Sequence, residues 1–312
     1  IRRGCAAVAA RARHVAITPR LSQCAAELAH TPLQPPPLDP VAHYLGRGDD
    51  TVAFFLTLDA INFGSGYFPL LRKRPGASGY TTIATALADR FRAHGPWSSE
   101  ELSALSPADC AAVFGQDPAV PAIHELMTLF AAALNELGRF VSRHHEGRCA
   151  GVIDAAAGSA ARLVTVLAGM PGFRDVARYD TLTVPFFKRA QLLAADLFLA
   201  FGGEGRGRFG DLHRLTIFAD NLVPHVLHEE GVLAYADPLQ RAIEAGELIE
   251  AGSEEEVEIR ACAVHAAERL VAELAALGRP MPARQLDWLL WNRGQEPRYK
   301  NRPRHRTRTT FY

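Results

Sequence analysis

The sequence has no excess of charge of either sign and no long apolar run. Its 34 Lys and Arg residues equal its 34 Asp and Glu residues, so no overall field favours nucleic acid or a membrane surface. No apolar stretch approaches the roughly 18 residues that a membrane-spanning helix needs. We therefore expect no membrane association and no stable complex with nucleic acid.

Closely spaced cysteines are also absent. The chain has five cysteines, and none forms a C-x-x-C pair, which argues against a disulfide framework and against a zinc knuckle. A reduced, cytoplasmic protein is the expectation. The five are Cys5, Cys24, Cys110, Cys149 and Cys262.

Familiar nucleotide and hydrolase motifs are missing as well. There is no G-x-G-x-x-G followed by an acid, no Walker A pattern and no G-x-S-x-G elbow. His225 and His228 have a spacing that places both on one face of a helix, but the zincin pattern is absent. We expect these histidines to be solvated or capping, with no metal ion and no cofactor.

Helical periodicity dominates what is present. Apolar residues recur at three- and four-residue spacing between Ile123 and Val141, which predicts one long helix. Ser253 and Glu256 form a capping-box pattern that opens a second long helix ending near Gly278. A third helix is expected from Val184 to Phe201. The pattern predicts a mainly α protein.

One stretch departs from that pattern, between residues 66 and 80. Two short apolar pieces flank the turn-forming "RKRPGAS", which predicts a small β-hairpin. A Pro-rich connector, "HTPLQPPPLDP", lies near the N-terminus. We expect one compact domain over residues 1–312, in which 1–40 form a helical arm and connector and 41–312 form the catalytic body.

The C-terminal segment "RYKNRPRHRTRTTFY" is basic. Six Arg or Lys residues lie between Arg298 and Arg308, and their alternation with polar residues is typical both of an arm that touches phosphate and of a solvated tail. The aromatic ending, Phe311 and Tyr312, favours a docked terminus. Both alternatives stay open on the sequence.

Three acids lie in apolar surroundings: Asp59, Asp220 and Asp287. A lone acid of this kind is usually an N-cap or half of an ion pair. Three in one helical chain favour a pocket, and paired carboxylates beside aromatics suit glycoside-type chemistry. Phe218 and Trp288 are aromatics close to two of these acids.

Several ordered segments carry a family resemblance. "LTLDAINFG", the "SGY" after the turn, "FFKRAQLLAADLF", "LTIFADNLVPHVL", "EVEIRACAV", "LDWLLWN" and the terminal "HRTRTTFY" resemble the queuosine salvage protein family, the queuosine 5'-phosphate N-glycosylases. The match runs from about His43 to the last residue. No single segment is diagnostic, but seven in this order are specific together.

The resemblance implies hydrolysis of the N-glycosidic bond of queuosine 5'-monophosphate, which releases queuine for salvage into tRNA modification. It also implies a single helical domain with an architecture similar to DNA glycosylases, and no metal. Two alternatives remain: a base-flipping nucleic-acid glycosylase, and a non-catalytic protein that binds queuine or its nucleotide.

Within that resemblance, Asp220 is expected to act at the anomeric carbon, as nucleophile or transition-state stabiliser. Phe218 and Trp288 would sandwich the base, and Asp287 would accept hydrogen bonds from it. Trp288 departs from the tyrosine that is common in the family, so stacking is kept but a phenolic hydrogen bond is lost.

The remaining expected contacts are less direct. Lys188 is the favoured ligand of the 5'-phosphate, with Arg189 structural and the basic tail as an alternative. His43 is a weaker candidate for pocket contact. Asn292 stands where related sequences can carry an acid, which weakens that part of the match. Asp59 is expected to support the site from below.

Overall fold

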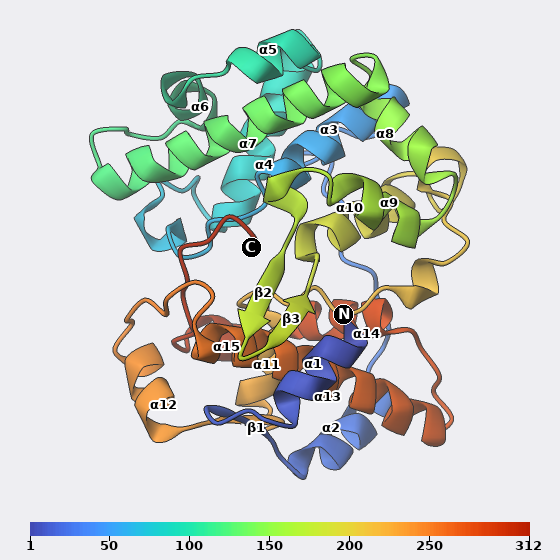
Figure 1. Cartoon of the computed structure of the whole chain (residues 1–312), viewed down its shortest axis with the longest axis vertical. Helices are drawn as coiled ribbons and strands as arrows, with labels where there is room; N and C mark the ends of the chain where they lie inside the picture. Colours follow the sequence, from blue (N-terminus) through green and yellow to red (C-terminus); the bar gives the residue numbers. More distant parts are fainter. The chain divides into compact units, whose positions relative to one another are not determined.

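The computed structural model describes residues 1–312 and is mainly helical, which confirms the predicted class (Figure 1). The contacts divide the chain into two compact units. The first unit comprises residues 1–36, 175–188 and 213–308, and the second comprises 37–174, 189–212 and 309–312. One domain over residues 1–312 stays a prediction.

The elements of the first unit are α1 (Arg2–Ala9), β1 (Val15–Ile17), α2 (Arg20–Ala29), β2 (Val176–Tyr179), β3 (Leu182–Pro185), α11 (Val223–Glu229), β4 (Leu233–Tyr235), α12 (Asp237–Glu244), α13 (Glu254–Ala276), α14 (Ala283–Arg293) and α15 (Pro297–Lys300). A 3-10 turn, η4 (Leu212–Arg214), precedes its long C-terminal segment.

The elements of the second unit are α3 (Asp49–Ala60), η1 (Phe68–Leu70), α4 (Gly79–His94), α5 (Ser99–Ala104), α6 (Pro107–Phe114), α7 (Pro121–His145), α8 (Cys149–Ala156), α9 (Ala160–Leu167), η2 (Pro171–Phe173) and η3 (Gly205–Gly207). α10 (Lys188–Ala200) follows β3, and only its first residue is counted with the first unit.

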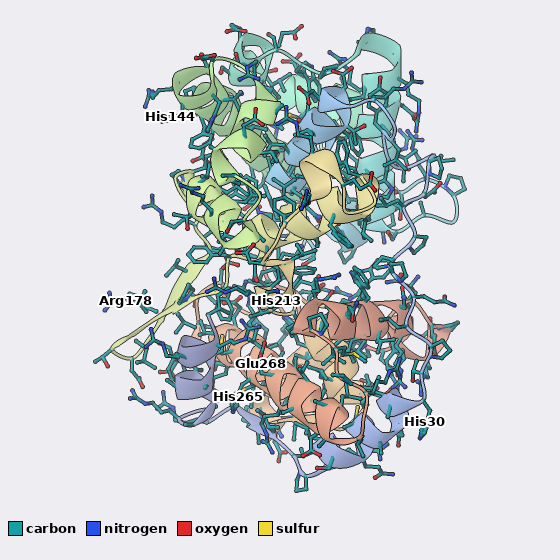
Figure 2. The ribbon with its side chains drawn as sticks, turned by 90° about the vertical axis from the view of Figure 1, so that its right-hand side faces the viewer. His30, His144, Arg178, His213, His265 and Glu268 are labelled. Atoms are coloured by element: carbon teal, nitrogen blue, oxygen red, sulfur yellow. The ribbon has the colours of Figure 1, made fainter.

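The core of the first unit is built around α13. α1 and α2 pack against it, and the short pair β1–β4 is antiparallel (Figure 1). At the surface Arg2 of α1 pairs with Glu268 of α13 at 2.7 Å; Figure 2 labels Glu268. Ser253 accepts a hydrogen bond from the Glu256 N–H at the start of α13, as the capping pattern predicts. The N-terminal helices therefore belong to this core.

Glu258 fastens the N-terminal arm to α13. Its side chain is fully buried and accepts the backbone N–H groups of Arg13, His14 and Val15 at 2.6 to 3.0 Å. The Tyr179 hydroxyl donates a further hydrogen bond at 2.7 Å. The buried carboxylate is thus satisfied by hydrogen bonds.

Strands β2 and β3 form an antiparallel hairpin in which Val176 faces Pro185. Asp180, at its turn, has a φ of 49°, which an Asp tolerates better than most side chains. Arg178 is exposed on this hairpin (Figure 2). Because Val184 and Pro185 belong to β3, α10 begins at Lys188, later than the periodicity suggested.

The long helix expected in the middle of the chain is α7, whose buried stripe includes Ile123 and Val141. α5 and α6 pack against it in the second unit. None of the helices combines the length and apolar character needed to cross a bilayer.

The hairpin expected between residues 66 and 80 is wrong. This stretch contains the 3-10 turn η1 and irregular chain, and α4 begins at Gly79. Pro69 and Pro75 lack the N–H that a paired strand would donate. Ser78 accepts a hydrogen bond from the Thr81 N–H and so caps α4 instead of ending a strand.

Candidate functional site

Asp220 lies just before α11. Its Oδ1 accepts the backbone N–H groups of Leu222 at 2.7 Å and Val223 at 3.3 Å. The residue is half-buried. It therefore has the capping geometry that a lone acid often has, and it keeps partial access to solvent.

Asp287 lies on α14 and is only 4% exposed. Its Oδ1 accepts the backbone N–H of Phe218 at 2.8 Å. Burial, together with the nearby charge of Asp220, raises the pKa of Asp287 to about 8, against the lowering effects of the Phe218 N–H and Lys188. The Asp287 carboxyl is therefore mostly protonated at neutral pH.

Lys188, the first residue of α10, brings a positive charge to the acids. Its side chain is buried, and it lies close enough to Asp287 to lower the pKa of that carboxyl. Arg189 is also buried but donates to the carbonyl oxygens of Asp59, Ala60 and Gly172. The two adjacent basic side chains therefore have different surroundings: Lys188 lies near Asp287, and Arg189 binds backbone carbonyl groups.

The two predicted aromatics, Phe218 and Trp288, are both buried. Trp288 follows Asp287 on α14, and the guanidinium of Arg284 lies 4.8 Å from the centre of its ring. Arg284 is one turn earlier on the same helix, which is the spacing that brings side chains together. Such a cation–π contact occupies one face of the indole.

The basic C-terminal segment is docked where the structure places it in the first unit. Arg304 lies near Asp220, whose charge opposes the lowering of the Arg304 pKa by burial. His305 is 1% exposed, and its pKa is lowered to about 3, mainly by burial and also by His225, Arg260 and Arg304. A freely solvated tail is therefore the wrong alternative for this part.

Three predicted residues have other surroundings. The Asn292 amide donates to the Gln34 carbonyl at 3.0 Å and so ties α14 to the Pro-rich connector. His43 belongs to the second unit, where its ring stacks on Phe55 and its Nε2 lies 3.1 Å from the Tyr80 hydroxyl. Asp59, also in the second unit, is fully buried.

The histidine pair of α11 is used within the fold. His225 Nε2 lies 2.9 Å from the Tyr299 carbonyl oxygen, and His228 Nδ1 lies 3.1 Å from that of Leu233. The His228 ring also stacks on Tyr235. The structure gathers no three His, Cys, Asp or Glu side chains into a metal-binding group.

Sequence reasoning missed Asp175, Arg284 and an individual role for Arg304. Asp175 forms a bidentate pair with Arg260, but these residues are far apart in sequence and only the fold brings them together. Arg284 had a local signal, because it stands four residues before Trp288 on a predicted helix.

Comparison with known proteins shows that the candidate residues described above all lie within the match to one protein family. The family model described as "Queuosine salvage protein" covers residues 42–312. A protein of Sphaerobacter thermophilus is 38% identical over 94% of this chain and 91% of its own length. One of Dictyostelium discoideum is 33% identical over 84% and 78%, respectively.

A third relative, from Mus musculus, is 33% identical over 64% of this chain and 62% of its own length. All three carry the name queuosine 5'-phosphate N-glycosylase/hydrolase. Asp220, Asp287, Trp288 and Lys188 all lie within the region that the family model matches. The chain belongs to the queuosine salvage protein family.

Proposed function

We propose that this chain hydrolyses the N-glycosidic bond of queuosine 5'-phosphate, the substrate that the names of its relatives state. The bond between the anomeric carbon and the base nitrogen breaks, and the oxygen of a water joins the anomeric carbon. A proton from that water ends on the base. The products are queuine, available for salvage into tRNA modification, and ribose 5-phosphate.

The observation that carries the proposal is that Asp220 lies close enough to Asp287 to raise its pKa, while the two acids have unlike environments. Asp287 is buried and has a pKa raised to about 8, whereas Asp220 is half-buried at the start of α11. Two carboxyl groups in different surroundings can divide the roles of hydrogen-bond donor and negative charge between them. Glycosidic hydrolysis needs both roles.

The leaving group explains why a neutral Asp287 is useful. Queuine is a 7-deazaguanine and lacks the basic N7 that a purine hydrolase can protonate. A protonated Asp287 donates a hydrogen bond to the base as negative charge develops on it. This role differs from the acceptor role that the sequence suggested, because the effect of burial on the Asp287 pKa outweighs that of Lys188 and the acid keeps its proton.

Asp220 is the proposed group at the sugar. Its carboxylate stabilises the positive charge that develops on the anomeric carbon, or forms a bond to that carbon before water replaces it. Lys188 and Arg304 supply positive charge near the two acids and are the proposed ligands of the 5'-phosphate. Phe218 and Trp288 would hold the base.

The proposed partner is therefore a small nucleotide. The zero formal net charge gives no general attraction for a nucleic-acid backbone, so we propose no stable nucleic-acid complex. A cytoplasmic location is part of the same proposal, because the five cysteines are free thiols, which suits a reducing compartment.

The test is direct release of base. Purified protein is incubated with queuosine 5'-phosphate, and free queuine and ribose 5-phosphate are measured by mass spectrometry. Asp220→Asn keeps an oxygen that can accept the Leu222 N–H but removes the charge, so turnover should fall by about 10³-fold or more.

Asp211→Asn is the matched control. The Asp211 carboxylate also accepts backbone N–H groups at a helix start, those of Ala160 and Ala161, and its loss should leave turnover unchanged. Wild-type protein that binds the nucleotide but releases no base would favour a non-catalytic binder. Strong, salt-dependent duplex binding would favour the nucleic-acid glycosylase.

A further inference from the structure

The entry of the chain into α10 is fixed by one residue, Asp175. Its carbonyl oxygen accepts the N–H groups of Phe186 at 2.9 Å and Phe187 at 3.1 Å. Its carboxylate Oδ2 accepts the N–H of Lys188 at 3.1 Å. Three consecutive N–H groups therefore end on Asp175, and they hold Phe187 at a φ of 52°, which is unusual for a bulky side chain.

Arg260 of α13 connects this residue to the segment that carries Asp220. Its two terminal nitrogens donate to both oxygens of Asp175, at 3.0 and 2.6 Å. Its Nε donates to the carbonyl of Ala219 at 3.0 Å, and Ala219 is bonded directly to Asp220. Both side chains of the ion pair are almost completely buried, with 2% and 3% exposed.

We propose that the Asp175–Arg260 ion pair is a positioning pair that sets where Lys188 stands relative to Asp220. The proposal rests on the function proposed above, and it concerns the same site. One side of the pair holds the backbone of Lys188, and the other holds the carbonyl next to Asp220. The planar guanidinium joins the two through fixed angles.

Stability alone is a weak reason for this arrangement. A buried ion pair costs much desolvation, and apolar residues of the same volume often stabilise a core equally well. Geometry is a stronger reason, because even a small displacement of a reacting group from its productive position lowers turnover strongly. The Phe186 ring, 4.0 Å from the Arg260 guanidinium, further limits how that group can move.

Two conservative variants separate the two sides of the pair. Arg260→Lys keeps a positive charge beside Asp175 but loses the fork that also reaches Ala219, so kcat should fall about 10–100-fold while KM for the nucleotide stays within about threefold. Asp175→Asn places an amide NH2 against a donor, either Arg260 or the Lys188 N–H. It should raise KM for queuosine 5'-phosphate about tenfold and raise KM for queuosine much less.

Glu258→Gln is the matched control. Glu258 lies on α13 two residues before Arg260 and is equally buried, but it holds the N-terminal arm at Arg13 to Val15. This variant should lower the melting temperature and leave kcat and KM per folded molecule unchanged. Circular dichroism and the melting temperature of each variant supply the folded fraction.

The outcomes are distinguishable. If both pair variants lower only the melting temperature, as Glu258→Gln does, the pair is structural and the proposal is overturned. If Asp175→Asn does not fold, Arg260→Lys decides the matter by its kcat. If the wild-type protein releases no queuine, the proposed function fails, and the pair is then judged by the Kd of the same variants for queuosine 5'-phosphate, where an unchanged Kd overturns it.

Discussion

The backbone N–H of Phe218 donates a hydrogen bond to the Asp287 carboxyl over 2.8 Å. Phe218 stands two residues before Asp220, so the segment that carries one acid is fastened to the side chain of the other. Asp220 also raises the pKa of Asp287. The two acids are therefore linked by the hydrogen bond from the Phe218 backbone and by the interaction of their charges. A substitution of Asp220 is expected to change the pKa of Asp287.

The raised pKa of Asp287 predicts that turnover falls at alkaline pH. With a pKa of about 8, Asp287 loses its proton as the pH rises through that value, and with it the hydrogen bond that we propose it donates to the base. We expect kcat/KM to fall above pH 8. Asp287→Asn keeps a neutral donor, so its lower activity should show no such limit between pH 7 and about 9. A wild-type profile that is flat across this range would contradict the assignment.

The same pKa predicts how stability changes with pH. Asp287 has a folded pKa of about 8 against an ordinary 3.8, so between these values the folded state binds more protons than the unfolded state. Stability therefore falls as pH rises through this window, by up to about 1.4 kcal/mol per pH unit. The melting temperature of Asp287→Asn, relative to wild type, should rise from pH 5 to pH 8. A constant difference would sink the prediction.

Removal of the Lys188 charge should separate nucleotide from nucleoside. If Lys188 holds the 5'-phosphate, Lys188→Ala raises KM for queuosine 5'-phosphate by about 10–100-fold, the usual cost of a lost charge-assisted contact. KM for queuosine should change much less. Lys73→Ala, which removes an exposed lysine outside the basic C-terminal segment, is the control. Equal losses on both substrates would show that Lys188 serves the fold or the chemistry and not the phosphate.

If Trp288 stacks on the base, its ring should contribute to the affinity for queuine. Trp288→Leu removes the ring and should weaken the binding of free queuine by about 1–3 kcal/mol, the range found for base stacking on aromatics. Trp288→Tyr keeps an aromatic face and should keep most of that affinity. Isothermal titration with queuine measures both. Equal binding by the leucine variant would place the base elsewhere.

The long helices were predictable because their signals are local. The apolar stripe from Ile123 to Val141 and the cap at Ser253 each lie within one element, where periodicity and capping decide the structure. The hairpin expected over residues 66–80 is absent because the local signal is ambiguous. Turn-forming residues between two apolar pieces occur both in a hairpin and in irregular chain that leads into a helix. Ser78 shows the difference only through the N–H that it accepts.

Residues of the candidate site could be proposed from the sequence only where an unusual residue type marked them. Asp220 and Asp287 stood out because acids in apolar segments need a reason. Asp175 gave no such signal, since its importance comes from Arg260, which is distant in the chain and close only in the fold. The donor role proposed for Asp287, in place of the expected acceptor role, likewise depends on burial, which no spacing of residues encodes.

The docked C-terminal segment predicts a sensitivity to acid that runs opposite to the effect of Asp287. The folded pKa of His305 is about 3 against an ordinary 6.5, so the unfolded state binds more protons between these values. The contribution of neutral His305 is therefore fully present above pH 6.5 and is lost as the pH falls toward 3. His305→Gln cannot take up a proton, so its melting temperature should fall less than that of wild type between pH 7 and about 5.

His30→Gln, at an exposed histidine of the same unit (Figure 2), should follow the wild-type curve. Parallel curves for His305→Gln and wild type would mean that His305 is not the acid-sensitive group.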